Sequence, residues 1–179
     1  MFALSPYLLA GGGEKVKKVV LMSTIALLTL ATMIISPVKA ITKAPYWEHV
    51  EFNPADFDQP RKQWISEEGV LHVKDWHWVG TYEGTLGTGT MDVWFEQISL
   101  DLATGEGTLS GKWLVTIPDV GTIAGSARGK ITAFVFGSGT FAGTHGTGMF
   151  EGVKKMGSFN VNMASVPYTI DASGTIIYP

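Results

Sequence analysis

The chain has 179 residues, of which 45% are hydrophobic, only 16% are charged and 22 are glycine. This composition supplies one buried core, and it favours short strands joined by tight turns over a helical bundle. The formal net charge is −3 and cysteine is absent, which excludes disulfides and thiolate chemistry and leaves no basic stripe that would bind nucleic acid.

Residues 1–40 have the layout of a signal peptide preceded by a short upstream extension. An apolar segment, residues 19–35, is broken by Pro37 before a small-residue site that ends at Ala40. We therefore expect a signal helix that is cleaved near Ala40 and a secreted or extracytoplasmic protein. The alternative is an uncleaved segment that anchors the protein, which would be its only contact with a membrane. The basic residues that precede the apolar segment are Lys15, Lys17 and Lys18.

Residues 41–63 show no sustained hydrophobic period. Pro45, Pro54 and Pro60 lie among acidic and aromatic residues, and proline interrupts regular hydrogen bonding. We interpret this stretch as an extended N-terminal arm that packs on the domain formed by residues 64–179.

From Trp64 onward, short segments with strand-like composition alternate with turn residues. A long strand at 91–102 places Met91, Val93 and Phe95 on one face and Asp92, Trp94 and Glu96 on the other. The segments expected as strands are 70–74, 76–82, 91–102, 108–117, 122–126, 130–136, 140–142, 149–151, 158–164 and 175–178.

These segments predict an all-β domain in which successive strands pair as antiparallel hairpins. About eight strands in such an order leave exposed edges unless the sheet closes, so a small antiparallel barrel is the simplest fold. A two-sheet β-sandwich is the alternative, because strand spacing alone does not distinguish the two.

Two stretches carry a family resemblance, Trp64–Lys74 and Gly137–Gly152. The second contains the spacing G-x-G-x-F-x-G-x-x-G-x-G. Together they resemble the allene oxide cyclase-like barrel group, which includes dirigent proteins and bacterial and archaeal members. The resemblance implies an eight-stranded antiparallel barrel and permits an isomerase or cyclase activity. No catalytic residue of the group can be matched to a position here, so the catalytic residues are unknown.

The candidate ligand-binding residues are one histidine, two carboxylates and two tryptophans. His145 lies between the glycines of the Gly143–Gly148 turn, where we expect a ligand at the end of the barrel. Carboxylates beside aromatic residues in a lumen would have raised pKa values suited to proton transfer. On the outer face of the strand they would only be solvated. The other four candidates are Glu83, Trp94, Glu96 and Trp113.

No recognised spacing of ligands predicts a metal site, and no motif predicts a cofactor. Three functions remain open: an exported barrel that binds a small apolar or aromatic molecule, an isomerase or cyclase, and a structural or cell-surface interaction module. The sequence favours binding, leaves open whether the protein is an enzyme, and does not predict an oligomeric state.

Overall fold

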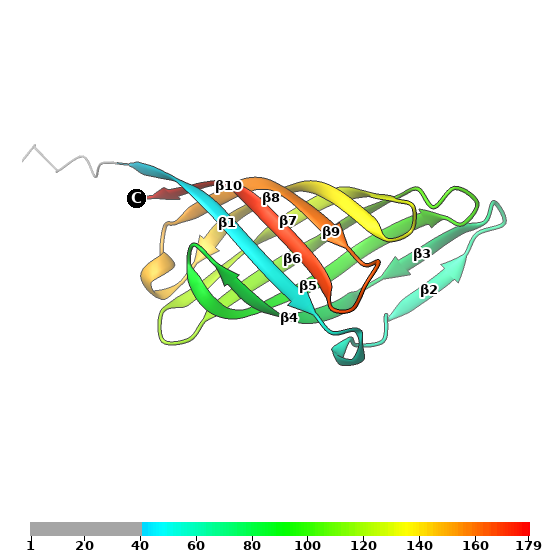
Figure 1. Ribbon diagram of the computed structural model, residues 1–179, viewed down its shortest axis with the longest axis horizontal. Coiled ribbons are helices and arrows are strands. Elements are labelled where there is room, and N and C mark those ends of the chain that lie inside the picture. Colours follow the sequence, from blue (N-terminus) through cyan, green and yellow to red (C-terminus); the bar gives the residue numbers. More distant parts are fainter. Residues whose placement is uncertain (1–40) are drawn as a thin grey trace, which may run out of the picture. The chain divides into compact units, whose positions relative to one another are not determined.

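The computed structural model describes residues 41–179, and these residues form one β-barrel unit (Figure 1). The signal helix, the upstream extension and cleavage near Ala40 concern residues 1–40, which lie outside the described residues and stay predictions. No helix among the described residues has the length and hydropathy needed to cross a bilayer.

Ten strands and two short 3₁₀ helices make up the unit. Their bounds are β1 Thr42–Phe52, η1 Pro54–Asp56, β2 Lys62–Ile65, β3 Val70–Lys74, β4 Trp76–Gly84, β5 Gly87–Asp101, β6 Gly107–Ile117, β7 Gly121–Thr132, β8 Phe136–Gly146, η2 Gly148–Phe150, β9 Lys154–Asn162 and β10 Tyr168–Tyr178.

Eight strands close the barrel in the order β5-β4-β1-β10-β9-β8-β7-β6, and pairing between β5 and β6 joins the two ends of the sheet. Every neighbouring pair is antiparallel. Closure gives each of these eight strands a hydrogen-bonded neighbour on both sides over at least part of its length. The predicted antiparallel barrel is therefore confirmed, and the alternative of a two-sheet sandwich is wrong.

Strands β3 and β4 are two parts of one run that both pair with the 15-residue strand β5. Asp75 separates them with a positive φ of 53°, a conformation that aspartate tolerates better than most residues. The β2–β3 hairpin continues past the barrel along the second half of β5, and it projects at one end (Figure 1).

The first part of the expected N-terminal arm is instead a barrel strand. β1 pairs with β10 along its whole length and with β4 from Glu48 to Phe52. Pro45 lies in the half that has no β4 partner, where a missing backbone N–H is tolerated. The barrel thus begins at Thr42, not at Trp64, and only residues 53–61 connect β1 to the β2–β3 hairpin without strand structure.

The long strand β5 keeps the expected alternation only in its first half. Met91, Val93 and Phe95 are buried as one face, but Phe95 pairs with Gly111 and Gln97 with Ser110, so Glu96 is an extra, bulged residue. A bulge shifts the side-chain alternation by one position. Ile98 and Leu100 therefore join the inner face, although simple alternation places them on the outer one.

One segment expected as a strand is a turn, and another contains one. Residues 149–151 belong to η2 and its cap, and the segment 130–136 contains the β7–β8 turn, where Ala133 and Phe134 have positive φ. Gly148 has a φ of +61°, and a Cβ there would lie 2.3 Å from the Val120 carbonyl oxygen. Gly148 thus occupies a corner that favours glycine, whereas residues 143–146 of the predicted Gly143–Gly148 turn belong to strand β8.

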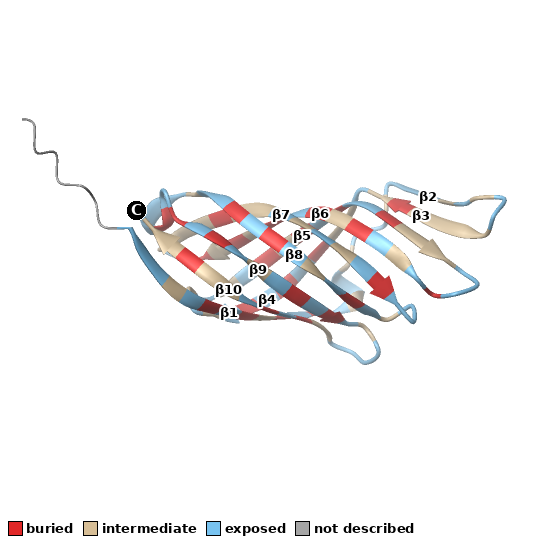
Figure 2. Cartoon of the chain, turned by 90° about the horizontal axis from the view of Figure 1, so that it is seen from above, coloured by how far each residue is buried: buried red, intermediate tan, exposed pale blue. Residues whose placement is uncertain are grey.

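Buried side chains alternate with exposed ones along the barrel strands (Figure 2). Three connections, β4–β5, β6–β7 and β8–β9, lie at the same end of the barrel. The barrel interior at this end is filled by apolar side chains that are at most 6% exposed. These plugging residues are Val115, Ile117, Ile123, Phe150, Val153 and Ile176. We call this the packed end and the other the open end.

Candidate functional site

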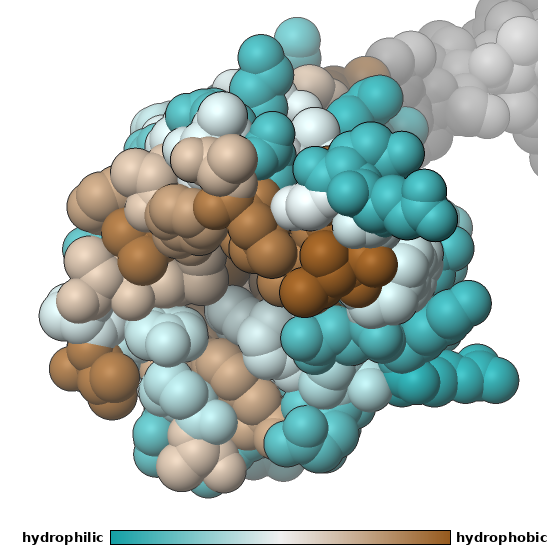
Figure 3. Space-filling view, turned by 90° about the vertical axis from the view of Figure 1, so that its right-hand side faces the viewer, coloured by the Kyte–Doolittle hydropathy of each residue, from teal (hydrophilic) through white to brown (hydrophobic). Residues whose placement is uncertain are grey.

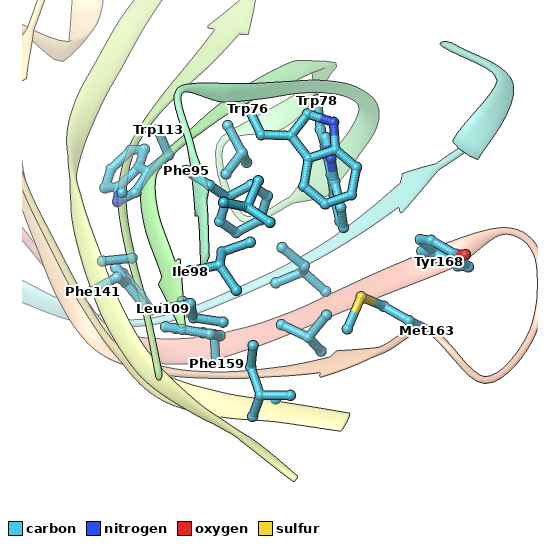
Figure 4. A pocket seen from close by; sticks show the side chains of 18 of the residues that line it. Trp76, Trp78, Phe95, Ile98, Leu109, Trp113, Phe141, Phe159, Met163 and Tyr168 are labelled. Carbon is cyan, nitrogen blue, oxygen red and sulfur yellow. The ribbon is translucent and has the colours of Figure 1, made fainter. Parts of the chain in front are cut away.

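The open half of the barrel encloses a cavity of about 290 Å³. This volume is near the lower limit of small-molecule sites, about 300 Å³. Side chains from all eight barrel strands point into it (Figure 4). Among the residues that line it are Trp76, Trp78, Phe95, Ile98, Leu109, Trp113, Ala127, Ile131, Phe141, Phe159, Val161 and Ile170.

The mouth of the cavity lies at the open end. Leu100, Val135 and Met163 line the cavity at the ends of β5, β8 and β9, beside the connections of that end. Viewed from this side, apolar side chains gather around a recess (Figure 3). The Gly143–Gly148 segment runs to the packed end, so the mouth lies opposite to the end where the sequence led us to expect a ligand.

Aromatic rings form one wall near the mouth. Trp76 and Trp78 are two positions apart on β4, so both side chains point inward. Their rings pack edge to face with centroids 5.0 Å apart. Phe95 packs against Trp78 with its centroid at 4.7 Å. Such contacts between rings add to the free energy gained by burial alone.

The segment 53–61 closes over this aromatic wall. Phe57 stacks on Trp78 with centroids 4.1 Å apart and planes 4° apart. Its neighbour Asp58 accepts a hydrogen bond from Trp76 Nε1 at 2.7 Å through its carbonyl and contacts His77 Nδ1 at 2.8 Å through its carboxylate. Backbone and side-chain bonds therefore hold the segment beside the mouth.

A buried charged cluster lies at the inner end of the cavity. Lys155 Nζ donates to Glu48 Oε2 at 2.8 Å and to Tyr46 Oη at 2.5 Å, and Tyr46 Oη donates to the same carboxylate oxygen. The side chains of Lys155 and Glu48 are 0% and 3% exposed. Buried charges are tolerated only when paired and hydrogen-bonded, as they are here.

Aromatic rings surround the Lys155 ammonium group. Nζ lies 4.1 Å from the Trp113 ring centroid, 4.7 Å from that of Tyr46 and 5.4 Å from that of Phe141. Ring faces attract a cation at these distances. Burial raises the pKa of Glu48 and lowers the pKa of Lys155, and their mutual contact opposes both shifts. The contacts of Lys155 are those of a cation paired with a carboxylate.

Two glycines make room for the Trp113 ring. Gly125 and Gly143 pair across β7 and β8, and a Cβ at either one would lie 2.5 Å or less from atoms of the six-membered indole ring. Part of the glycine-rich motif therefore serves close packing rather than a turn. This packing holds the Trp113 ring beside Lys155.

Two indole N–H groups of the lining have no acceptor within the described residues, those of Trp78 and Trp113. Both side chains are almost fully buried, at 2% and 3% exposure. A buried donor without an acceptor costs free energy. Both nitrogens lie inside the wall rather than on the surface of the cavity, because neither has accessible area.

Of the five candidate residues from the sequence, only Trp113 lines the cavity. Trp94 lies on the outer surface with 37% exposure and stacks on His77, and Glu96 pairs there with Lys112. Glu83 and His145 are exposed, and His145 Nδ1 lies 3.0 Å from the hydroxyl oxygen of the neighbouring Thr144. The structure does not bring the five candidates together. The Glu83 and Glu96 carboxylates are solvated and do not line the lumen, which is the second of the two interpretations given above.

Sequence reasoning missed Glu48 and Lys155, the two charged residues inside the barrel. Tyr46, Glu48, Val50 and Phe52 share the inner face of β1 with period two. This period-two pattern is present in the sequence. The charged residue at one inward position interrupts the apolar alternation, so the pattern is hard to recognise as a buried face. Among the described residues, no three side chains of histidine, aspartate or glutamate gather as a metal site requires.

Comparisons with known proteins add no relative. No family model matches the chain, and neither a curated protein nor a solved structure shows significant similarity to it. The resemblance to the allene oxide cyclase-like group therefore stays a prediction, and the site has to be interpreted from its own geometry.

Proposed function

We propose that this protein binds one small apolar or aromatic molecule inside the open half of its barrel. The observation that carries this proposal is the cavity of about 290 Å³, which is enclosed by apolar and aromatic side chains and reached from one end. Apolar surface gains about 25 cal/mol for each Å² removed from water. A ligand that fills such a lumen therefore binds chiefly through burial.

The rim of the open end supports this proposal. Large apolar side chains are exposed on its connections, with Leu102 at 40%, Phe134 at 45% and Val166 at 68%. Exposed apolar groups around a mouth are typical of sites that take up apolar ligands. Together with the predicted export signal, the rim points to a ligand met outside the cytoplasm.

The proposal is tested by titrating a neutral fluorescent probe, N-phenyl-1-naphthylamine, into the purified protein. Binding in the lumen places the probe beside Trp78 and Trp113, so we expect saturable binding and quenching of tryptophan emission. Ala127→Phe adds a ring to a residue that lines the cavity. We expect it to weaken binding at least tenfold, because the ring takes up space that the probe needs.

Ser126→Phe is the matched control, since it adds the same ring to the exposed neighbour on the same strand. It should leave the affinity within twofold of the wild-type value. Non-saturable binding to the wild-type protein, or equal effects of the two substitutions, would show that the lumen is not the site.

The isomerase or cyclase hypothesis and the surface-module hypothesis stay predictions. Chemical change of a bound molecule during the same titration would favour the enzyme. A lumen that takes up no probe would favour the surface module.

A further inference from the structure

One oxygen of the Glu48 carboxylate has no donor. Oε2 accepts from both Lys155 and Tyr46, whereas no hydrogen bond within residues 41–179 involves Oε1. Glu48 is 4% exposed and lines the cavity. Oε1 is not one of the fully buried atoms that lack a partner, so it is accessible from the cavity. A ligand donor can reach it there, and a hydrogen bond to a charged acceptor contributes more than a neutral one.

We propose that the ligand is an apolar molecule with a neutral hydroxyl group, which enters head first and donates a hydrogen bond to Glu48. This inference rests on the proposed binding function and adds the chemical class of the ligand. The apolar body would lie along the wall toward the mouth.

The charge of the cluster argues against an anionic head. Glu48 is the only acidic residue of the lining, and the Lys155 ammonium group that neutralises it is fully buried. A ligand carboxylate would face Glu48 in surroundings of low dielectric constant, where like charges repel strongly. Lys112 also lines the cavity, but its ammonium group pairs with Glu96 at 2.7 Å on the outer surface. Among the described residues, no cation of the lining is therefore free to pair with an ionised fatty acid.

The same cluster argues against a cationic head. Lys155 already pairs with Glu48 at 2.8 Å and lies over the rings of Trp113 and Tyr46. A second cation at Glu48 would leave one positive charge uncompensated inside the barrel, which is costly.

A hydroxyl group supplies the donor that Glu48 Oε1 lacks. The indole N–H groups of Trp78 and Trp113 are buried inside the wall and do not reach the cavity surface, so they add no polar contact. An ether can accept but not donate, so it would leave Glu48 Oε1 without a partner. The free oxygen of Glu48 thus selects for the O–H donor.

The depth of the cavity sets the length of the probe. Leu109, Gly111 and Trp113 line it along β6, and four residue steps cover about 13 Å of strand. A linear ten-carbon alcohol is of similar length, which makes 1-decanol a suitable probe.

The experiment measures how well four chains of similar length displace N-phenyl-1-naphthylamine from the purified protein. They are 1-decanol, its isomer 1-methoxynonane, decanoate and decylammonium. We expect 1-decanol to bind about tenfold or more tightly than the ether, since hydrogen bonds to charged groups contribute more than neutral ones. Decanoate and decylammonium should also bind more weakly than the alcohol.

The variant that removes the acceptor is the double substitution Glu48→Met with Lys155→Met. Changing Glu48 alone would leave Lys155 buried without its partner and could unfold the protein, whereas replacing both charges by apolar groups of similar size is usually tolerated. In this variant the alcohol and the ether should bind within twofold of each other.

Three results would overturn the inference: an ether that binds as tightly as the alcohol in the wild-type protein, an ion that binds more tightly than the alcohol, or an alcohol preference that persists in the double variant. If the neutral probe still binds saturably in these cases, the proposed binding function stands and only the ligand class is wrong. If the probe does not bind at all, the proposed function itself fails.

Discussion

At the scale of single residues, the barrel interior is divided by a few side chains that do not fit the apolar pattern. Glu48 and Lys155 place a paired charge where the packed end meets the cavity. Glu48 and Trp113 both line the cavity, and the Trp113 ring centroid lies 4.1 Å from Lys155 Nζ. The charged groups inside the barrel therefore come from residues that interrupt the apolar alternation of their strands.

The glycine recess under Trp113 gives a direct prediction. A Cβ at Gly143 would lie 2.4 Å from the indole ring and 3.1 Å from Lys155 Cγ, so Gly143→Ala should lower the free energy of unfolding by about 1–3 kcal/mol through overpacking. Urea denaturation measures this change. Trp113→Phe removes the ring atoms that would collide, so in a double-mutant cycle it should recover part of the loss. Additive effects of the two substitutions would contradict the recess.

At the scale of the elements, period-two alternation predicted most of the strands but neither bulges nor inward charges. The segments 108–117 and 70–74 match β6 and β3 closely, because apolar and polar residues alternate there without interruption. The pattern failed at β1, where Glu48 interrupts it, and after Glu96, where the bulge reverses the faces. A bulge depends on the partner strand, so the sequence of one strand alone does not reveal it.

The site was predicted less well than the fold for the same reason. Trp113 was identified because an indole suits a pocket wall. Trp94 and Glu96 were assigned to a possible lumen, but the register of β5 turns them outward. Which face of a strand points inward is decided by pairing across the whole barrel, which sequence spacing does not record.

The segment 53–61 is held beside the mouth by a pH-sensitive contact. His77 lies between Asp58 and Asp92, at 2.8 and 2.9 Å, and stacks on Trp94. Burial alone would lower the pKa of His77, but its hydrogen bonds to both carboxylates and their charges outweigh burial, so the pKa is raised above its ordinary value.

A raised pKa in the folded state means that protonated His77 stabilises the fold. This contribution is fully present below the unfolded pKa of about 6.5 and is lost as the pH rises through the higher folded value. We therefore expect the difference in Tm between wild type and His77→Phe to shrink between pH 5 and pH 9. The Phe variant keeps a ring against Trp94 but does not titrate. A difference that stays constant with pH would contradict this assignment.

At the scale of the whole barrel, the two halves differ in packing. The packed end is filled by buried aliphatic side chains such as Ile123 and Ile176, both 0% exposed. The open half keeps a cavity of about 290 Å³. Closure of the sheet makes this division possible, because a barrel of eight strands is just wide enough for side chains or for one small ligand.

The central claim is that a ligand occupies the open half and leaves the packed end untouched. Isoleucine methyl groups report on both halves without any substitution. Ile98, Ile131 and Ile170 line the cavity, whereas Ile117, Ile123 and Ile176 fill the packed end. In methyl-labelled protein titrated with 1-decanol, followed by NMR, we expect saturable shifts of the first three signals and unchanged positions for the other three. Shifts confined to the packed-end signals, or no saturable shift in any of the six, would contradict the account.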